Sequence, residues 1–229
     1  DHAGCTTEDI LSRVGLKPSD LFTEEKSCTR TSEQEYQYRN ADGSICYKKK
    51  RFDKADGSKF FCFYMPDGAK GLTDGTLHVP YNLPTVCAAS RIYFVEGEKC
   101  ADAVINQGFC ATTLDTGANS RWYPYYNAYF QGKEVIIIPD NDKPGMAYAK
   151  RISQNIPNSK IIPLDAPRKK YDIYDWLKDG HKMEELDSIA PMEVDSKDPP
   201  LSDESSAVSE KSTQTEILLK LISDTDTKF

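Results

Sequence analysis

The chain has 229 residues, 38% of them hydrophobic, and a net charge of −7, which suits one medium-sized α/β domain with appendages. Twelve acidic and five basic side chains lie from His181 to Phe229, while the first 180 residues carry 24 of each sign, so the acidic balance does not exclude a nucleic-acid partner for the body of the chain. No apolar run approaches the roughly 18–20 residues of a membrane span, and the N-terminus has no signal-peptide core, which predicts a cytoplasmic protein.

The first part of the chain predicts a short helix and a small β-rich subdomain. The helix is expected within residues 6–22. Residues 35–64 predict a β-meander, because strand-like runs are separated by Asp42-Gly43 and Asp56-Gly57, and Asp-Gly between such runs is a strong hairpin signal. The β-rich subdomain is predicted to extend over residues 35–90.

From residue 91 the chain alternates between strand-like and helical segments. Strands are predicted at 91–95, 109–114, 134–140 and 160–164. Helices are predicted at 98–107, 121–131 and 145–156. Strands separated by helices of this length imply βαβ crossovers and a parallel sheet flanked by helices. This domain is predicted to span residues 91–187.

The rest of the chain changes character. Residues 188–214 are rich in Pro, Ser, Asp and Glu, a composition that cannot offset the entropy of folding, so they are predicted to be a disordered acidic linker. Residues 215–229 return to an amphipathic pattern and are expected to begin a further region.

Carboxylates follow the predicted strands of the parallel sheet. Glu96 follows the first strand, Asp140 and Asp142 follow the third, and Asp172 and Asp175 come after the fourth. The carboxyl ends of parallel strands open on one edge of a sheet, where ligand sites form. Clustered carboxylates suit magnesium or manganese, and Pro144 with Gly145 is predicted to turn the chain there.

Each acidic group alone has an ordinary explanation. A Glu-Gly pair after a strand is usually a turn, an Asp-x-Asp pair is often a solvated loop, and Asp172 with Asp175 can cap the helix that follows. The order and spacing of the whole set indicates a site.

This set of motifs resembles a known family. Residues 91–180, with FVEGEKCADAVINQGFCATTLDTGANSRW followed by VIIIPDNDKPG, resemble the Toprim domain of DnaG-like primases from phages and mobile elements. The resemblance implies a Rossmann-like α/β fold. It implies that Glu96 is a general acid or base, that Asp140 and Asp142 bind Mg²⁺ or Mn²⁺, and that Asp172, with Asp175 as a further candidate, belongs to the same site.

The flanking segments resemble parts of the same proteins. HAGCTTEDIL, in the predicted remnant at residues 1–22, resembles the end of a zinc-binding module, but His2 and Cys5 alone cannot complete a tetrahedral site, so zinc is expected only where the missing module is present. Residues 215–229 resemble the lead-in to a helicase-like ATPase region, although no GxxxxGK[ST] motif is present. The chain begins with Asp and is expected to be a fragment.

Two basic runs are candidate nucleic-acid contacts. Lys48, Lys49, Lys50 and Arg51 lie in a β-meander that also carries several aromatic residues, a combination that suits single-strand binding, or they form the solvated face of a strand. Arg168, Lys169 and Lys170 follow the fourth strand and either meet triphosphate oxygens or lie in a solvated loop.

The expected function is that of a DNA primase fragment. It would join nucleoside triphosphates into short primers on single-stranded DNA during replication, beside a replicative helicase domain or protein. Metal ions would stabilise the in-line displacement, and Lys99 is a further candidate for neutralising a phosphate. The alternatives are a Toprim-type nuclease, which would use the same carboxylates, and a non-catalytic module that binds DNA or a helicase. The aromatic segment 121–130 is expected to pack in the core, and His78 and His181 receive no role.

Overall fold

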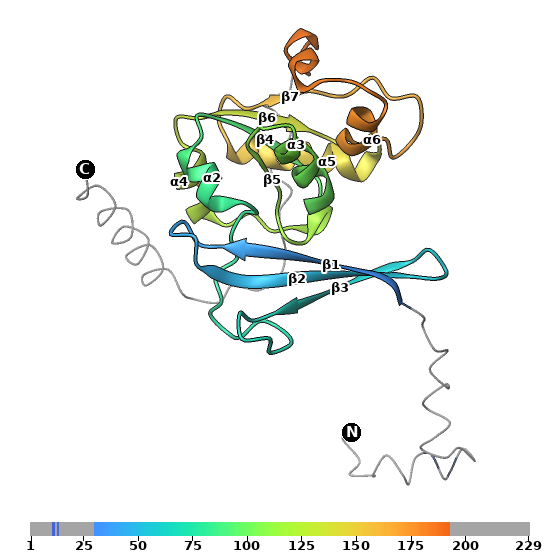
Figure 1. Ribbon diagram of the computed structural model, residues 1–229. Helices are drawn as coiled ribbons and strands as arrows, with labels where there is room; N and C mark the ends of the chain where they lie inside the picture. The colour runs from blue at the N-terminus through green and yellow to red at the C-terminus, as the bar shows by residue number, and fades with distance from the viewer. Residues whose placement is uncertain (1–10, 12, 14–29, 193–229) are drawn as a thin grey trace, which may run out of the picture. The chain divides into compact units, whose positions relative to one another are not determined.

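The computed structural model describes residues 30–192 together with Leu11 and Arg13 (Figure 1). Apart from Leu11 and Arg13, the predicted N-terminal remnant lies outside the described residues, as do residues 193–214 of the predicted linker and the predicted region at 215–229. Contacts divide the chain into two compact units. Among the described residues, one contains Lys50–Cys62 and those up to Glu35, and the other contains Tyr36–Lys49 and those from Phe63 to Met192. The domain boundaries expected from the sequence stay predictions.

The predicted meander is a three-stranded sheet in the order β1-β2-β3 (Figure 1). Its strands are β1 (Arg30–Arg39), β2 (Ile45–Lys54) and β3 (Lys59–Tyr64). Both Asp-Gly pairs form the turns: Gly43 and Gly57 have φ angles of 86° and 80°, which glycine adopts without strain. Asp42 and Asp56 each accept a hydrogen bond from the backbone N–H two residues later, which closes the turn.

The second sheet is parallel, with four strands in the order β5-β4-β6-β7. Its strands are β4 (Arg91–Val95), β5 (Ala111–Thr112), β6 (Glu134–Ile138) and β7 (Lys160–Ile161). The central pair, β4 and β6, is in register along its whole length, from Arg91 opposite Glu134 to Val95 opposite Ile138. The α/β fold class, with a parallel sheet flanked by helices and preceded by a small β-sheet, is confirmed, although the edge strands β5 and β7 are shorter than predicted.

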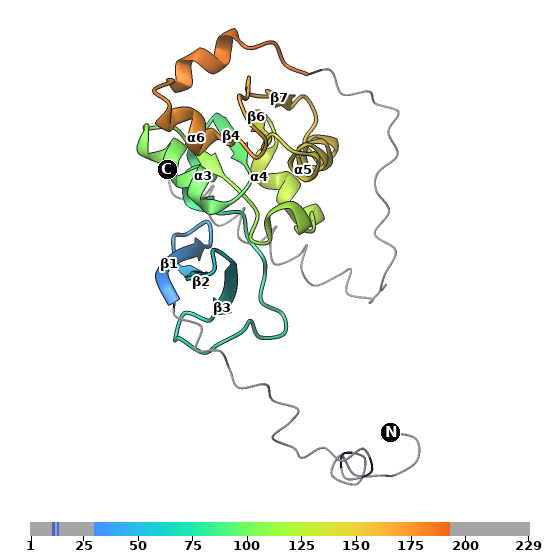
Figure 2. The same cartoon turned by 90° about the vertical axis from the view of Figure 1, so that its right-hand side faces the viewer.

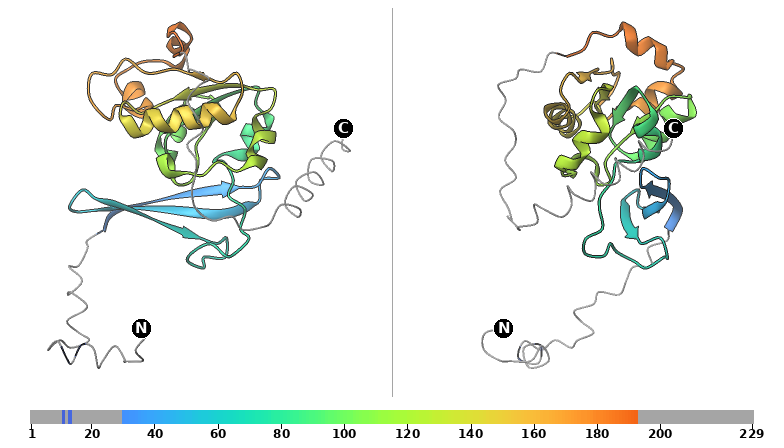
Figure 3. Two further views of the ribbon diagram at one scale, coloured as in Figure 1. Left: turned by 180° about the vertical axis from the view of Figure 1, so that it is seen from behind. Right: turned by 90° about the vertical axis from the view of Figure 1, so that its left-hand side faces the viewer.

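Helices cover both faces of the parallel sheet (Figure 2). One face packs against α3 (Glu98–Asn106) and α6 (Ile173–Lys178), through a core that contains Tyr93, Val95 and Ile138. The other face packs against α2 (Leu83–Ala88), α4 (Asn127–Phe130) and α5 (Lys143–Asn155), and Figure 3 shows α5 from behind. Because both faces are buried, β4 and β6 are apolar along nearly their whole length.

The aromatic segment departs from the single helix predicted at 121–131. It forms a short 3₁₀ helix, η3 (Pro124–Tyr126), and then the single turn of α4. The ring of Trp122 contacts those of Tyr126 and Phe130, which lie in the core, and this agrees with the expected packing role. Two further 3₁₀ helices are η2 (Gly117–Asn119) and η4 (Met183–Ser188). Among the described residues, no helix has the length and apolar character to cross a membrane.

Candidate functional site at the carboxyl edge of the parallel sheet

Two predicted site residues, Glu96 and Asp140, follow neighbouring strands at the same edge of the sheet. Val95 at the end of β4 is paired with Ile138 at the end of β6. Glu96 therefore leaves the sheet at the level of Pro139, immediately before Asp140. Thr113 steadies the turn after β4, because its hydroxyl accepts a hydrogen bond of 2.9 Å from the backbone N–H of Gly97.

The loop after β6 leads directly into α5. Asp142 caps this helix: its Oδ1 accepts a hydrogen bond of 2.8 Å from the backbone N–H of Gly145. The Asp142 backbone N–H also donates to the carbonyl of Asp140, at 2.7 Å. The prediction that Pro144 and Gly145 form the turn was wrong, since α5 begins at Lys143 and both residues lie within its first turn. Pro144 suits that place because a first-turn N–H has no partner within the helix.

Gly145 allows α5 to approach the Asp140 backbone. A Cβ at this position would lie 2.7 Å from the Asp140 carbonyl oxygen and 3.0 Å from its nitrogen. These are backbone atoms, which cannot move without moving the carboxylate. The glycine of the Asp-x-Asp-x-x-Gly pattern therefore allows α5 to pack against the Asp140 backbone without displacing the Asp140 carboxylate.

Asn141 joins the β6 loop to the loop that precedes α6. Its backbone N–H donates to the carbonyl of Tyr171 at 2.9 Å, and its side-chain Nδ2 donates to the carbonyl of Arg168 at 2.9 Å. In return, the Lys170 N–H donates to the Asn141 carbonyl at 3.1 Å. The sequence reasoning missed this residue, whose only signal was its place between two aspartates.

The hydrogen bonds of Asn141 bring the loop that carries Asp172 close to the carboxylates that follow β6. Asp172 caps α6, where its Oδ1 accepts a hydrogen bond of 2.8 Å from the Asp175 backbone N–H. Burial raises the pKa of the Cys100 thiol well above its usual value, and the negative charges of Asp172 and Asp140 raise it further. The buried thiol of Cys100 on α3 is therefore close enough to both carboxylates for their charges to affect its pKa. The high pKa keeps Cys100 a thiol and agrees with its place in the core.

The donor set fits a hard divalent cation that is bound in part by its substrate. In residues 30–192, no three His, Cys, Asp or Glu side chains stand close enough to hold a metal ion by themselves. Mg²⁺ commonly binds through one or two carboxylates, with waters and substrate phosphates completing its shell. Asp140, Asp142 and Asp172 offer only oxygen ligands, and the capping bonds of Asp142 and Asp172 each use one oxygen.

The second basic run lies beside these acidic residues. Arg168 forms an ion pair of 2.9 Å with Asp175, and all three residues of this run are exposed. Lys99, on α3, places its ammonium 3.4 Å from the ring centroid of Tyr174 on α6. Cations therefore border the acidic edge, as binding of a polyphosphate requires.

The four residues of the first basic run, 48–51, differ in burial and in their ion-pair partners. Lys49 is buried, and its ammonium contacts Glu98 Oε1 at 2.6 Å, so its charge is compensated inside the protein rather than offered at the surface. Lys50 pairs with Glu33 at 2.7 Å, and Arg51 pairs with Asp53 at 2.8 Å. Lys48 is partly exposed. The nucleic-acid contacts stay predictions, and burial removes Lys49 from the residues suited to them.

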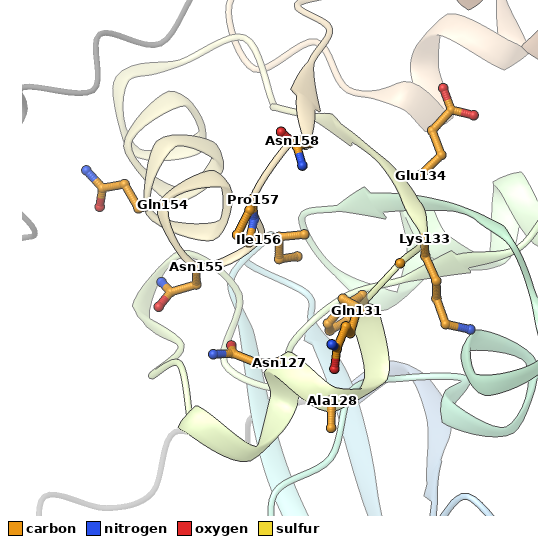
Figure 4. Close-up of a pocket in the computed structure, with 12 residues that line it drawn as sticks. Asn127, Ala128, Gln131, Lys133, Glu134, Gln154, Asn155, Ile156, Pro157 and Asn158 are labelled. Atoms are coloured by element: carbon orange, nitrogen blue, oxygen red, sulfur yellow. The ribbon is translucent and has the colours of Figure 1, made fainter.

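A hollow lies at the opposite edge of the parallel sheet (Figure 4). Its lining comes from α4, from the start of β6 at Glu134 and from the residues that follow α5, including Pro157. Lys133 extends from this region to three carbonyl groups at the end of α2. None of the residues predicted for the site lines the hollow.

Comparisons with known proteins find a curated relative and several solved structures of similar fold. No protein-family model matches the chain. The Gene 57 protein of Mycobacterium phage D29 is 33% identical over 86 residues, which cover 37% of this chain and 55% of that protein. The chain thus spans about half the length of this curated relative.

Solved primase structures cover more of the chain. The Aquifex aeolicus primase (zinc-binding and RNA polymerase domains) has a TM-score of 0.53 and 17% identity, covering 81% of this chain and 48% of that one. The DnaG primase catalytic domain bound to single-stranded DNA has a TM-score of 0.51 and 14% identity, covering 80% and 63%. The chain has a primase-like fold. A chain from a bacteriophage T7 complex of lagging-strand DNA polymerase with gp4 primase domains, an RNA/DNA hybrid and dTTP agrees, with a TM-score of 0.52 and 18% identity, covering 70% and 79%.

Proposed function

We propose that this chain is the catalytic part of a DNA primase of the phage or mobile-element kind, with a Toprim site that joins nucleoside triphosphates on a single-stranded DNA template. The observation that carries the proposal is the arrangement after β4 and β6: Glu96 and Asp140 follow neighbouring strands at one edge of the sheet, and Asn141 ties the loop that bears Asp172 to the loop after β6. The primase-like fold supports it, since the similar DnaG domain was solved with single-stranded DNA and the T7 complex with dTTP.

The residues have distinct expected tasks. Asp140, Asp142 and Asp172 would hold Mg²⁺ or Mn²⁺, which when bound neutralises phosphate charge and stabilises an in-line displacement. Glu96 would take up the proton of the attacking hydroxyl. Arg168, Lys169 and Lys170 would contact triphosphate oxygens, and Lys99 a phosphate at the α3 side. A replicative helicase domain or protein is the expected partner.

The test is primer synthesis by the full chain. It would be incubated with single-stranded DNA, labelled nucleotides and magnesium or manganese, beside an Asp140→Asn/Asp142→Asn double variant. Asparagine also caps helices, so this variant removes charge without removing the cap of α5. Glu184→Gln, an exposed carboxylate in η4, is the matched control.

Three outcomes are informative. Labelled oligonucleotides from the wild type and the control, but not from the double variant, would establish the primase. Shortening of the template with the same dependence would instead support a Toprim-type nuclease. Neither activity, with manganese still bound, would support a non-catalytic module that binds DNA or a helicase.

A further inference from the structure

A histidine without a role in the sequence reasoning belongs to a buried polar cluster. His78 Nδ1 lies 2.5 Å from Asp115 Oδ2, and the Tyr47 hydroxyl donates a hydrogen bond of 2.9 Å to the same oxygen. Asp115 is 6% exposed and Tyr47 is fully buried, whereas the His78 side chain is 30% exposed. A buried carboxylate therefore holds an imidazole that reaches the surface. All three residues belong to one of the two compact units.

The surroundings of His78 fix its orientation. The hydrogen bond with Asp115 raises the pKa of the imidazole, which favours the form in which both ring nitrogens donate. The hydroxyl of Tyr125 donates a hydrogen bond of 2.8 Å to the His78 carbonyl and so holds the backbone. With Nδ1 directed at Asp115, Nε2 is the nitrogen left to meet a ligand.

Tyr123 contacts both His78 and a second cation, Arg121. Its ring stacks on the His78 imidazole, with centroids 5.5 Å apart and planes 12° from parallel. The Arg121 guanidinium lies 5.4 Å from the centroid of the same Tyr123 ring, and Arg121 is exposed. The two side chains thus contact one aromatic ring, and contact with a ring restricts the motion of each, which reduces the entropy that each loses on binding a ligand.

The segment that carries Asp115 also passes close to Glu96. Asp115 lies just beyond β5, at the edge of the sheet where Glu96 follows β4. Two residues on, a Cβ at Gly117 would lie 3.9 Å from Glu96 Oε1. One short segment therefore connects the carboxylate that holds His78 with the neighbourhood of Glu96.

We propose that His78 and Arg121 form a phosphate-binding subsite beside Glu96, with Asp115 and Tyr47 as positioning residues for His78. The proposal rests on the proposed function and names how that site holds its substrate. Phosphate oxygens suit it, because imidazolium and guanidinium N–H groups form charge-assisted hydrogen bonds with them. The phosphate belongs either to the polynucleotide backbone or to a nucleoside triphosphate, which share this chemistry.

The experiment measures both sources with the full chain. Binding of a fluorescein-labelled dT20 oligonucleotide is followed by anisotropy at several salt concentrations, and binding of ATP with magnesium by calorimetry. His78→Gln and Arg121→Gln are the variants. His181→Gln is the matched control, because His181 also stacks on an aromatic ring, that of Trp176 at 4.6 Å, and also pairs with a carboxylate, Glu185 at 2.8 Å.

We expect each variant, but not the control, to weaken one ligand about tenfold, as loss of a charge-assisted hydrogen bond predicts. If the ligand is dT20, the slope of log affinity against log salt should fall by about 0.7 per lost contact. Asp115→Asn should reproduce part of the loss, and should add nothing in the His78→Gln background. If Asp115 acted only on the structure, Asp115→Asn would weaken ligand binding equally in the wild type and in His78→Gln.

The outcomes separate this inference from the proposed function. Weaker dT20 binding assigns the backbone phosphate, and weaker ATP binding assigns the triphosphate. Unchanged binding of both ligands by both variants overturns the subsite, even if primers are made. Weaker binding without primer synthesis by the wild type upholds the subsite and counts against the primase. Arg121→Gln, at an exposed position, keeps the test decisive if His78→Gln does not fold.

Discussion

The backbone N–H of Asn141 donates a 2.9 Å hydrogen bond to the carbonyl of Tyr171, so the residue between two candidate metal ligands is bonded to the residue before a third. Asp140 and Asp142 flank Asn141, and Asp172 follows Tyr171. The Asn141 side chain adds a second bond, to Arg168. The distance between Asp172 and the two aspartates after β6 thus depends on the hydrogen bonds of Asn141, an uncharged residue.

Replacing Asn141 with Ala should uncouple these loops. The variant loses the bond from Nδ2 to Arg168, which should lower the free energy of unfolding by only about 0.5–1.5 kcal/mol. Metal-dependent activity should fall by about tenfold or more, because small displacements of ligands are costly to catalysis. Primer synthesis and manganese titration measure these effects.

Asn155→Ala is the control for this prediction. Its Nδ2 donates a comparable 2.8 Å hydrogen bond to a carbonyl, that of Arg151, but at the far end of α5. Equal losses of activity in the two variants would show that Asn141 has no special role in the site.

Gly145→Ala should disturb Asp140. The added Cβ would stand 2.7 Å from the Asp140 carbonyl oxygen, and such overpacking typically costs about 1–3 kcal/mol, more than the roughly 1 kcal/mol that alanine gains over glycine in a helix. We expect a lower free energy of unfolding in urea and weaker manganese binding. Ala147→Gly, at an exposed position in the same helix, measures the propensity effect alone. Manganese binding as tight as in the wild type would contradict the role given to Gly145.

The sequence predicted the parallel sheet well because both faces of its central strands are buried. β4 and β6 are almost continuous apolar runs, and such runs are visible without any knowledge of their partners. The edge strands β5 and β7 pair over only two residues each, so their apolar residues extend past the hydrogen-bonded part. The prediction of a single helix at 121–131 was wrong because the aromatic rings of this segment pack at irregular spacing around Pro124.

The candidate site was predictable only where local sequence determines position. Carboxylates that follow strands must lie at one edge of a parallel sheet, and this argument located Glu96 and Asp140. Pairs distant in sequence give no such signal. Lys49 and Glu98 are 49 residues apart, and His78 and Asp115 are 37 apart, so neither the buried ion pair nor the His–Asp pair had a local pattern.

Lys49→Met should destabilise the protein strongly. The substitution leaves Glu98 buried, with the 2.7 Å hydrogen bond from the Tyr38 hydroxyl but without its cation. Removing one partner of a buried ion pair typically costs about 3–5 kcal/mol. Glu98→Leu in the same chain should recover much of this loss, because it removes the uncompensated charge. Chemical unfolding of the single and double variants measures both effects.

Lys50→Met is the matched control for Lys49. Lys50 pairs with Glu33 at 2.7 Å, but both side chains are partly exposed, at 27% and 47%. An exposed pair is worth about 0–1 kcal/mol, so this neighbour should be nearly neutral. Similar destabilisation by the two methionine variants would contradict the burial of Lys49.

The His78–Asp115 pair should make stability depend on pH with a defined sign. The hydrogen bond with Asp115 raises the pKa of His78 in the folded protein above its unfolded value of about 6.5. Folding therefore favours the protonated imidazole, and its stabilisation is fully present below the unfolded pKa and is lost as pH rises through the folded pKa. The difference in free energy of unfolding between the wild type and His78→Gln should thus be largest at acidic pH and shrink towards pH 9. Urea unfolding at intervals from pH 5 to 9 measures it. A difference that grows with pH would mean that His78 is held in its neutral form, with Nδ1 bonded to Asp115 but no charge to offer a phosphate.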